Sequence, residues 1–245
     1  MSIAETRSAA GGGLNSEFRR GVASCAPVLF GTIPYALVLG AQATQRGLST
    51  AELSLLTGLN FAGGSEFAAI QLWTSPPHVL LIIAITFLVN SRHLLMGAAL
   101  APFLRDLPRR KVFSALFFMC DESWALGLAD AKRRAADGVA PAFSRRYYMG
   151  AALAMYLTWV AFTTIGALLG PVLGDAETYG FDMAFAAVFL VLLRGMWKDV
   201  AAARPWLVSL IIAALTYLFV PGAWYVAAGA LAGLVSAWLL SRDEA

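Results

Sequence analysis

Long runs of apolar residues, each close in length to a membrane-spanning helix, constrain this chain more than any other feature. A helix needs about 20 apolar residues to cross the hydrocarbon core of a bilayer. Such runs occupy most of the sequence, at 21–43, 54–74, 78–104, 112–130, 147–170, 182–199, 205–220 and 223–240. The turn residues Pro221-Gly222 join the last two runs and predict a helical hairpin. The spacing of small residues typical of helix contacts in membranes occurs at Gly166/Gly170 and Gly229/Gly233.

The composition excludes a water-soluble domain. Hydrophobic residues make up 59% of the chain and charged residues only 13%, whereas soluble domains carry about 25% charged residues. So few polar side chains could not cover the apolar surface of a soluble domain of this length. The runs are continuous and rich in Ala and Leu, unlike the alternating strands of a membrane β-barrel. We therefore predict an all-α, polytopic integral membrane helix bundle with six to eight hydrophobic segments.

The ends of the apolar region define the expected domains. Residues 1–20 are largely polar and predict an N-terminal tail, and residues 21–241 predict a single transmembrane domain. Cys25 and Cys120 lie in apolar runs, without the spacing of metal ligands or of a disulfide framework. We expect buried thiols, no metal site and no cofactor. The net charge of +3 is concentrated in loops, which indicates membrane topology and not nucleic-acid binding.

Basic residues between the runs predict which loops are cytoplasmic. Four lie within 105–111 and five within 132–146, whereas 171–181 has two acidic residues and no basic one. Eight full spans would place 105–111 outside, against the preference of basic loops for the cytoplasm. If 54–74 and 112–130 instead enter and leave on one side, six spans remain and both basic loops are cytoplasmic. We favour two broken or re-entrant helices, and eight plain spans are the alternative.

The second run is interrupted by the segment Gly63-Gly64-Ser65-Glu66-Phe67. Glycine weakens a helix interior and serine is favoured as an N-cap, so we expect a half-helix to begin at Glu66 with Ser65 as its N-cap. The free N–H groups of a helix start at membrane depth suit an anion, such as the carboxylate of an amino acid. The alternative is that the small residues only permit close helix packing.

Arg92 and His93 interrupt the third run. A charge at the centre of a membrane helix costs about 2.5–3.5 kcal/mol on insertion scales. Residue 92 lies roughly 18 Å of helix from the end of its run, too far for its side chain to reach the interface. We therefore expect Arg92 to pair with an acidic residue. His93 is either a satisfied polar group or a proton carrier.

Asp121 and Glu122, in the fourth run, supply that acid. Two adjacent carboxylates cannot both be ionised in hydrocarbon, so we expect one to pair with Arg92 and the other to be protonated or to contact a ligand. Neighbouring residues on a helix point about 100° apart, so one can face a cavity and the other a partner helix. The alternative is an ion pair that only fixes the bundle. Trp124, which follows, is a candidate for an apolar pocket wall.

The order and spacing of these motifs resemble the AzlC/YgaZ family, the large subunit of bacterial branched-chain amino acid exporters. The likeness runs from about Phe18 to Ala129. It depends on Pro27, Gly31–Pro34, Ala62–Phe67, Arg92–Gly97 and Asp121-Glu122. The resemblance implies a multi-pass protein of the bacterial inner membrane that is not an enzyme. It also implies export of apolar amino acids such as valine, leucine or isoleucine, together with a small AzlD-like membrane subunit.

The chain departs from the family pattern at three positions. The family usually has glutamine where Glu66 stands, and tyrosine where Phe61 and Met96 stand. Glu66 adds a titratable group at the expected start of the half-helix. An acid there suits the helix dipole but would compete with the carboxylate of a substrate.

The combined expectation is a transport domain whose substrate site lies in the N-terminal half. The expected substrate-binding residues are Gly63, Gly64, Ser65, Glu66, Phe67, Arg92, Asp121, Glu122 and Trp124. Proton movement is expected through Glu66, His93 or Asp121, and no catalytic residue is expected. Two other functions use the same residues: an ion or proton channel, and an intramembrane hydrolase with Ser65 and His93. The sequence also leaves a homo-oligomer open.

Overall fold

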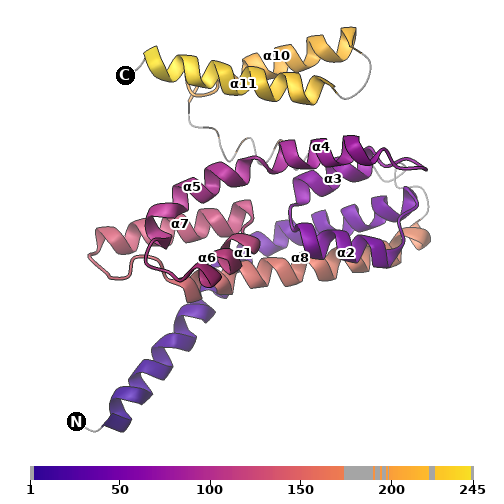
Figure 1. Ribbon diagram of the computed structural model, residues 1–245. Coiled ribbons are helices and arrows are strands. Elements are labelled where there is room, and N and C mark those ends of the chain that lie inside the picture. The colour runs from indigo at the N-terminus through magenta and orange to yellow at the C-terminus, as the bar shows by residue number, and fades with distance from the viewer. Residues whose placement is uncertain are drawn as a thin grey trace. The chain divides into compact units, whose positions relative to one another are not determined.

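The computed structural model (Figure 1) describes residues 3–173, 190, 194, 197, 199–220 and 224–243. The described residues form helices and no strand, which confirms the all-helical prediction. The chain divides into two compact units, Met1–Ala184 and Phe185–Ala245. Most of the predicted run 182–199 and of the acidic loop 171–181 lies outside the described residues.

The first unit contains eight helices among its described residues. They are α1 (Ile3–Gln45), α2 (Thr50–Asn60), α3 (Gly63–Gln71), α4 (Val79–Asn90), α5 (Arg92–Leu104), α6 (Arg109–Phe117), α7 (Asp121–Ala136) and α8 (Arg145–Leu173). Helix α1 therefore extends through the predicted tail. Three helical stretches described in the chain are long and apolar enough to cross a membrane. These are Ser16–Gln45, Val79–Leu104 and Arg145–Val172, the second of which combines α4 and α5.

Both runs predicted to break are divided in the structure. The run 54–74 forms α2 and α3, which are separated at Phe61 and Ala62. Phe61 has a left-handed backbone, with φ of 46°, and its N–H still donates to the Thr57 carbonyl at 3.1 Å. The run 112–130 lies within α6 and α7, which are separated at residues 118–120. Each break thus ends one helix and redirects the chain.

Helices α1 and α8 run parallel and touch along their backbones (Figure 1). A Cβ at Gly150 would lie 2.2 Å from the Phe18 carbonyl oxygen, and one at Gly166 would lie 2.2 Å from that of Leu37. Residue numbers therefore increase in the same direction on both helices. Gly170 also faces α1, so the predicted pair Gly166/Gly170 is a helix contact. Small residues allow this close approach.

Helices α2 and α3 form a hairpin against the C-terminal half of α8. The hydroxyls of Ser54 and Thr164 are 2.8 Å apart, and the Tyr156 hydroxyl donates to the Gly58 carbonyl at 2.9 Å. Helix α2 therefore runs antiparallel to α8 and ends beside the middle of α8. Helix α3 then returns, because Gln71 at its end donates to Gln42 near the end of α1 at 3.4 Å.

Helices α6 and α7 form a second hairpin at the opposite end of α8. The Arg145 guanidinium donates to the Ser114 hydroxyl at 3.1 Å, and the Phe118 and Tyr156 rings are 5.1 Å apart. Helix α6 therefore runs parallel to α8, from the start of α8 to the middle of α8. Helix α7 returns toward the start of α8, where Asp130 pairs with Arg20 on α1. The two hairpins thus approach the middle of α8 from opposite ends.

The second unit contains α10 (Arg204–Phe219) and α11 (Trp224–Asp243) among its described residues. A Cβ at Gly229 would lie 2.8 Å from Ala213 Cβ, and one at Gly233 would lie 3.1 Å from Ser209 Cβ. Residue numbers run in opposite directions, so the two helices are antiparallel. The predicted hairpin and the predicted contact at Gly229/Gly233 are both confirmed.

Candidate functional site

Polar side chains gather where the helices break. Arg92, at the start of α5, pairs with Asp121, at the start of α7, with an N–O distance of 3.0 Å. The Asn90 side chain, at the end of α4, donates to the Asn60 side chain at 3.3 Å. Asn60 in turn donates to Ser65 at 2.9 Å. These bonds connect the break in the first hairpin to α4, and the ion pair connects α5 to the second hairpin.

Glu66 is fully buried and its carboxylate is surrounded by N–H donors. The Ala62 backbone N–H donates to Oε1 at 2.9 Å and the Asn60 amide donates to the same oxygen at 3.3 Å. The Trp159 indole N–H donates to Oε2 at 2.7 Å. Glu66 therefore joins the start of α3 to the middle of α8.

The prediction that Ser65 caps a half-helix beginning at Glu66 is wrong. Helix α3 begins at Gly63 with Ala62 as its N-cap. The Ser65 hydroxyl donates to the Ala62 carbonyl at 2.9 Å and does not cap the helix. The physical reason is that Glu66 folds back to accept from the Ala62 N–H, which takes the place of a serine cap. Gly63 and Gly64 supply first-turn N–H groups that have no partner within the helix.

Aromatic rings enclose this helix start on one side. Phe67 stacks on Tyr35 with ring centres 4.3 Å apart, and Tyr35 is 5.5 Å from the Trp159 ring. A Cβ at Gly63 would lie 3.0 Å from Trp159 ring carbons, so the absence of a side chain permits this contact. Trp124 lies elsewhere, because its indole N–H donates to the Met96 carbonyl at 3.0 Å and its ring packs on the α5–α7 core.

The ion pair between Arg92 and Asp121 agrees with the expectation that a charge in this run finds an acid. Each side chain is 32% exposed. Arg92 Nε and Asn90 Oδ1 are buried atoms without a hydrogen-bond partner in the described part of the chain. Glu122, next to Asp121, makes no ion pair with the described residues. Among the described residues, the site therefore has one side-chain donor and one side-chain acceptor without a partner, and one carboxyl group without an ion pair.

His93 and Ser65 are not joined to each other by a hydrogen bond among the described residues. His93 Nδ1 lies 3.1 Å from the Asn90 backbone carbonyl, and Ser65 donates to Ala62. Each polar atom is therefore used by the neighbouring backbone. This arrangement differs from a nucleophile and base in contact.

The AzlC protein family model matches residues 27–173 of this chain. The chain belongs to the AzlC family. An uncharacterized membrane protein of Archaeoglobus fulgidus is 31% identical over 178 residues, which cover 72% of this chain and 74% of the relative. The branched-chain amino acid transport protein AzlC of Bacillus subtilis is 25% identical, with 74% and 68% covered. The inner membrane protein YgaZ of Escherichia coli is 26% identical, with 64% and 62% covered. No solved structure matches.

In this AzlC-family protein the matched region contains both hairpins and the whole polar site. Membership confirms the predicted family and the predicted membrane protein. Sequence reasoning missed Asn60, Tyr35 and Trp159 as site residues. The sequence could have indicated Asn60, because an amide side chain inside an apolar run needs a hydrogen-bond partner. Nothing in the sequence indicated Tyr35 or Trp159, since an aromatic residue in an apolar run can face either lipid or the protein core.

Proposed function

We propose that this AzlC-family protein is the large subunit of a secondary transporter that exports branched-chain or other apolar amino acids. The name of the Bacillus subtilis relative supports the substrate class. The observation that carries the proposal is the pair of broken hairpins, which bring two helix starts at Gly63 and Asp121 to the middle of α8. Broken helices that meet at the bilayer midplane are the usual binding device of secondary transporters.

The proposed membrane placement follows the directions of the helices. Helices α1, α4–α5 and α8 cross the bilayer, and the two hairpins re-enter from opposite sides. Both basic loops, 105–111 and 132–146, then lie on the side where α1 and α8 begin, which is the cytoplasm by the charge rule. Together with the three C-terminal runs that the sequence predicts as spans, this placement gives six crossings, the count favoured from the sequence.

The proposed substrate is a zwitterionic amino acid held between the two breaks. The N–H groups at Gly63 and Gly64 and the unfilled Nε of Arg92 suit its carboxylate. Glu122, which makes no ion pair with the described residues, and Asp121 suit its ammonium group. Phe67 and Tyr35 offer an apolar wall for the side chain. Glu66 is the favoured group for proton coupling, because it is fully buried among neutral donors. His93 and Asp121 are the other candidates.

Radiolabelled leucine efflux from cells that express the protein tests this site. We expect Arg92→Gln and Asp121→Asn each to lower the efflux rate by at least about tenfold, because each leaves a partly buried charge without its partner. The exposed Arg110→Gln is the matched control and is expected to export normally. Normal efflux in both site variants, at equal membrane abundance, would overturn the site assignment.

We also propose a small AzlD-like membrane subunit as a partner. The basis is the family resemblance and the large apolar surface that both units expose. Co-expression with an adjacent gene for a short protein with several apolar runs tests it. Efflux that depends on the second gene supports the partner, and undiminished efflux without it contradicts the partner.

A further inference from the structure

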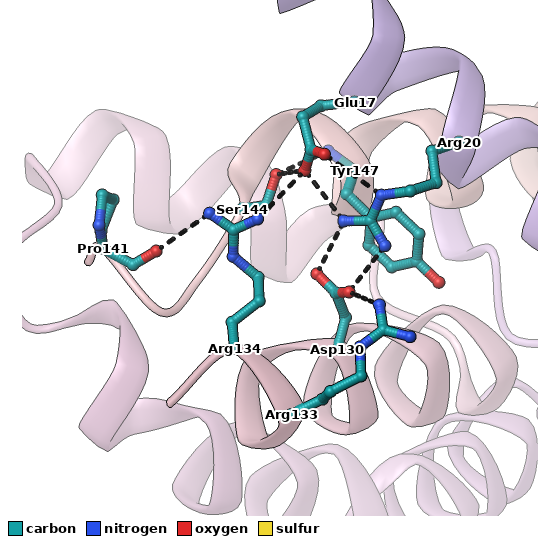
Figure 2. A network of polar contacts seen from close by, with 8 residues as sticks. All are labelled: Glu17, Arg20, Asp130, Arg133, Arg134, Pro141, Ser144 and Tyr147. Atoms are coloured by element: carbon teal, nitrogen blue, oxygen red, sulfur yellow. Dashed lines mark hydrogen bonds and ion pairs between the residues drawn. The ribbon is translucent and has the colours of Figure 1, made fainter. Parts of the chain in front are cut away.

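A network of charged side chains joins α1 and α7 to the start of α8, at the end of α8 opposite the first hairpin. Figure 2 shows this network from close by. Asp130 on α7 accepts from both terminal nitrogens of Arg20 on α1, at 2.7 and 3.1 Å. Arg133 also donates to Asp130, at 2.6 Å. The Asp130 side chain is only 3% exposed. A buried carboxylate with bidentate arginine contact is strongly held, and removing one partner leaves a charge uncompensated.

Glu17 extends the network to the start of α8. It accepts from Arg20 at 2.9 Å and from the Ser144 hydroxyl at 2.6 Å, and it lies 3.5 Å from Arg134. The Arg20 guanidinium also lies 4.0 Å from the centre of the Tyr147 ring. Figure 2 shows Glu17 and Asp130 on either side of Arg20, so one guanidinium bridges the two carboxylates. The network thus ties α7 to both long helices.

Ion pairs hold helix α7 at its start and in its second half. Asp121, at its start, pairs with Arg92, and Asp130, nine residues later and about 14 Å along the axis, pairs with Arg20. The first hairpin is held differently. Its end at Gln71 makes neutral amide contacts of 3.4 Å with Gln42 and accepts from the exposed Arg46 at 3.4 Å. Ion pairs therefore hold the second hairpin, whereas the described residues of the first hairpin make none.

We propose that the Glu17–Arg20–Asp130 network is an inner latch that keeps the second hairpin closed over the site. This inference rests on the proposed function of that site. A zwitterion that binds at Arg92 and Asp121 competes for the ion pair at one end of α7. The helix is then held by the latch alone, and release of the latch lets it move as a rigid body and open the site toward the end of the first unit where α8 begins. Alternating access requires such a two-state element that the substrate can bias.

The partly buried Cys120 is a built-in reporter of this movement, because it lies at the break between α6 and α7. In a Cys25→Ala background it is the only thiol in the chain. The experiment measures the rate at which a membrane-impermeant maleimide alkylates Cys120 in inside-out vesicles, at equal protein abundance. We expect Asp130→Asn and Arg20→Gln each to raise the rate at least about tenfold. The exposed Arg105→Gln is the control and is expected to leave the rate unchanged.

The double variant Arg20→Gln/Asp130→Asn separates a latch from general damage. We expect its alkylation rate to match that of the single variants, because both single changes break the same contact. The latch would be overturned if the increase in the double variant equalled the product of the increases in the two single variants. It would also be overturned if the single variants were alkylated no faster than the Cys25→Ala background. If Asp130→Asn raises alkylation but no variant, nor the unaltered protein, moves leucine, the latch stands and the proposed substrate fails.

Discussion

At the scale of single residues, the surroundings of Glu66 are specific for a carboxylate. Its two oxygens face the Ala62 N–H, the Asn60 amide and the Trp159 indole N–H, all of which donate. A carboxylate can accept all three, whereas a glutamine amide would turn its own N–H groups toward one of these donors.

We predict that Glu66→Gln lowers the free energy of unfolding by about 1–3 kcal/mol, because one buried donor is left facing another donor. Trp159→Phe in the same chain removes the opposing N–H and is expected to recover part of the loss. Thermal unfolding of the purified variants in detergent measures both effects. A Glu66→Gln protein as stable as the unaltered one would contradict this account of the carboxylate.

The sequence predicted that Arg92 pairs with one of the two adjacent acids, Asp121 and Glu122, because a charge in an apolar run needs an opposite charge nearby. It could not tell which of the two acids makes the pair. It could not predict the partners of Glu66. Trp159 is 93 residues away in an apolar run, and nothing in its neighbours marks its indole N–H as buried against an acid. The start of α3 was misplaced because the general preference for a serine cap was outweighed by a carboxylate that reached back one turn.

At the scale of elements, the contact between α1 and α8 depends on glycine. A Cβ at Gly40 would lie 2.1 Å from the Thr163 carbonyl oxygen, whereas a Cβ at Gly31, in the same helix, would meet nothing within 4 Å. The hairpins pack on this helix pair, so its spacing positions both helix breaks. The glycine spacing predicted a helix contact at Gly166/Gly170. It could not identify α1 as the partner, because the spacing of small residues on one helix does not specify which helix packs against it.

We predict that Gly40→Ala destabilises the protein by at least about 1–3 kcal/mol, since neither backbone can move without separating the two helices. Gly31→Ala is the matched control and is expected to be neutral or to stabilise by up to about 1 kcal/mol, because alanine favours helix more than glycine does. The melting temperatures of the two variants in detergent give the comparison. Equal melting temperatures would show that α1 and α8 do not touch through Gly40.

At the scale of the whole molecule, the two hairpins give the first unit an inverted arrangement. A long apolar helical stretch followed by a hairpin occurs twice, once as α1 with α2–α3 and once as α4–α5 with α6–α7, in opposite directions. Such inverted repeats are common in secondary transporters. The sequence indicated the two breaks through glycines and acids inside apolar runs. The directions of the half-helices could be determined only from contacts in the structure between residues distant in sequence.

Single cysteines introduced in a cysteine-free chain test the proposed placement in the membrane. We expect Arg110→Cys and Asp137→Cys to react with an impermeant reagent only from the cytoplasmic side, and Thr74→Cys only from outside. All three positions are exposed. If the hairpins crossed the membrane instead, residues 74 and 110 would exchange sides.

The central claim is that the helix breaks bind an amino acid and carry it across the membrane. Counterflow of radiolabelled leucine into proteoliposomes, reconstituted with the small subunit and preloaded with unlabelled leucine, tests it most directly. We predict saturable uptake by the unaltered protein, loss of uptake in Arg92→Gln, and unchanged uptake in Arg110→Gln. Uptake that does not saturate, or an ion conductance without leucine exchange, would contradict a carrier and favour a channel.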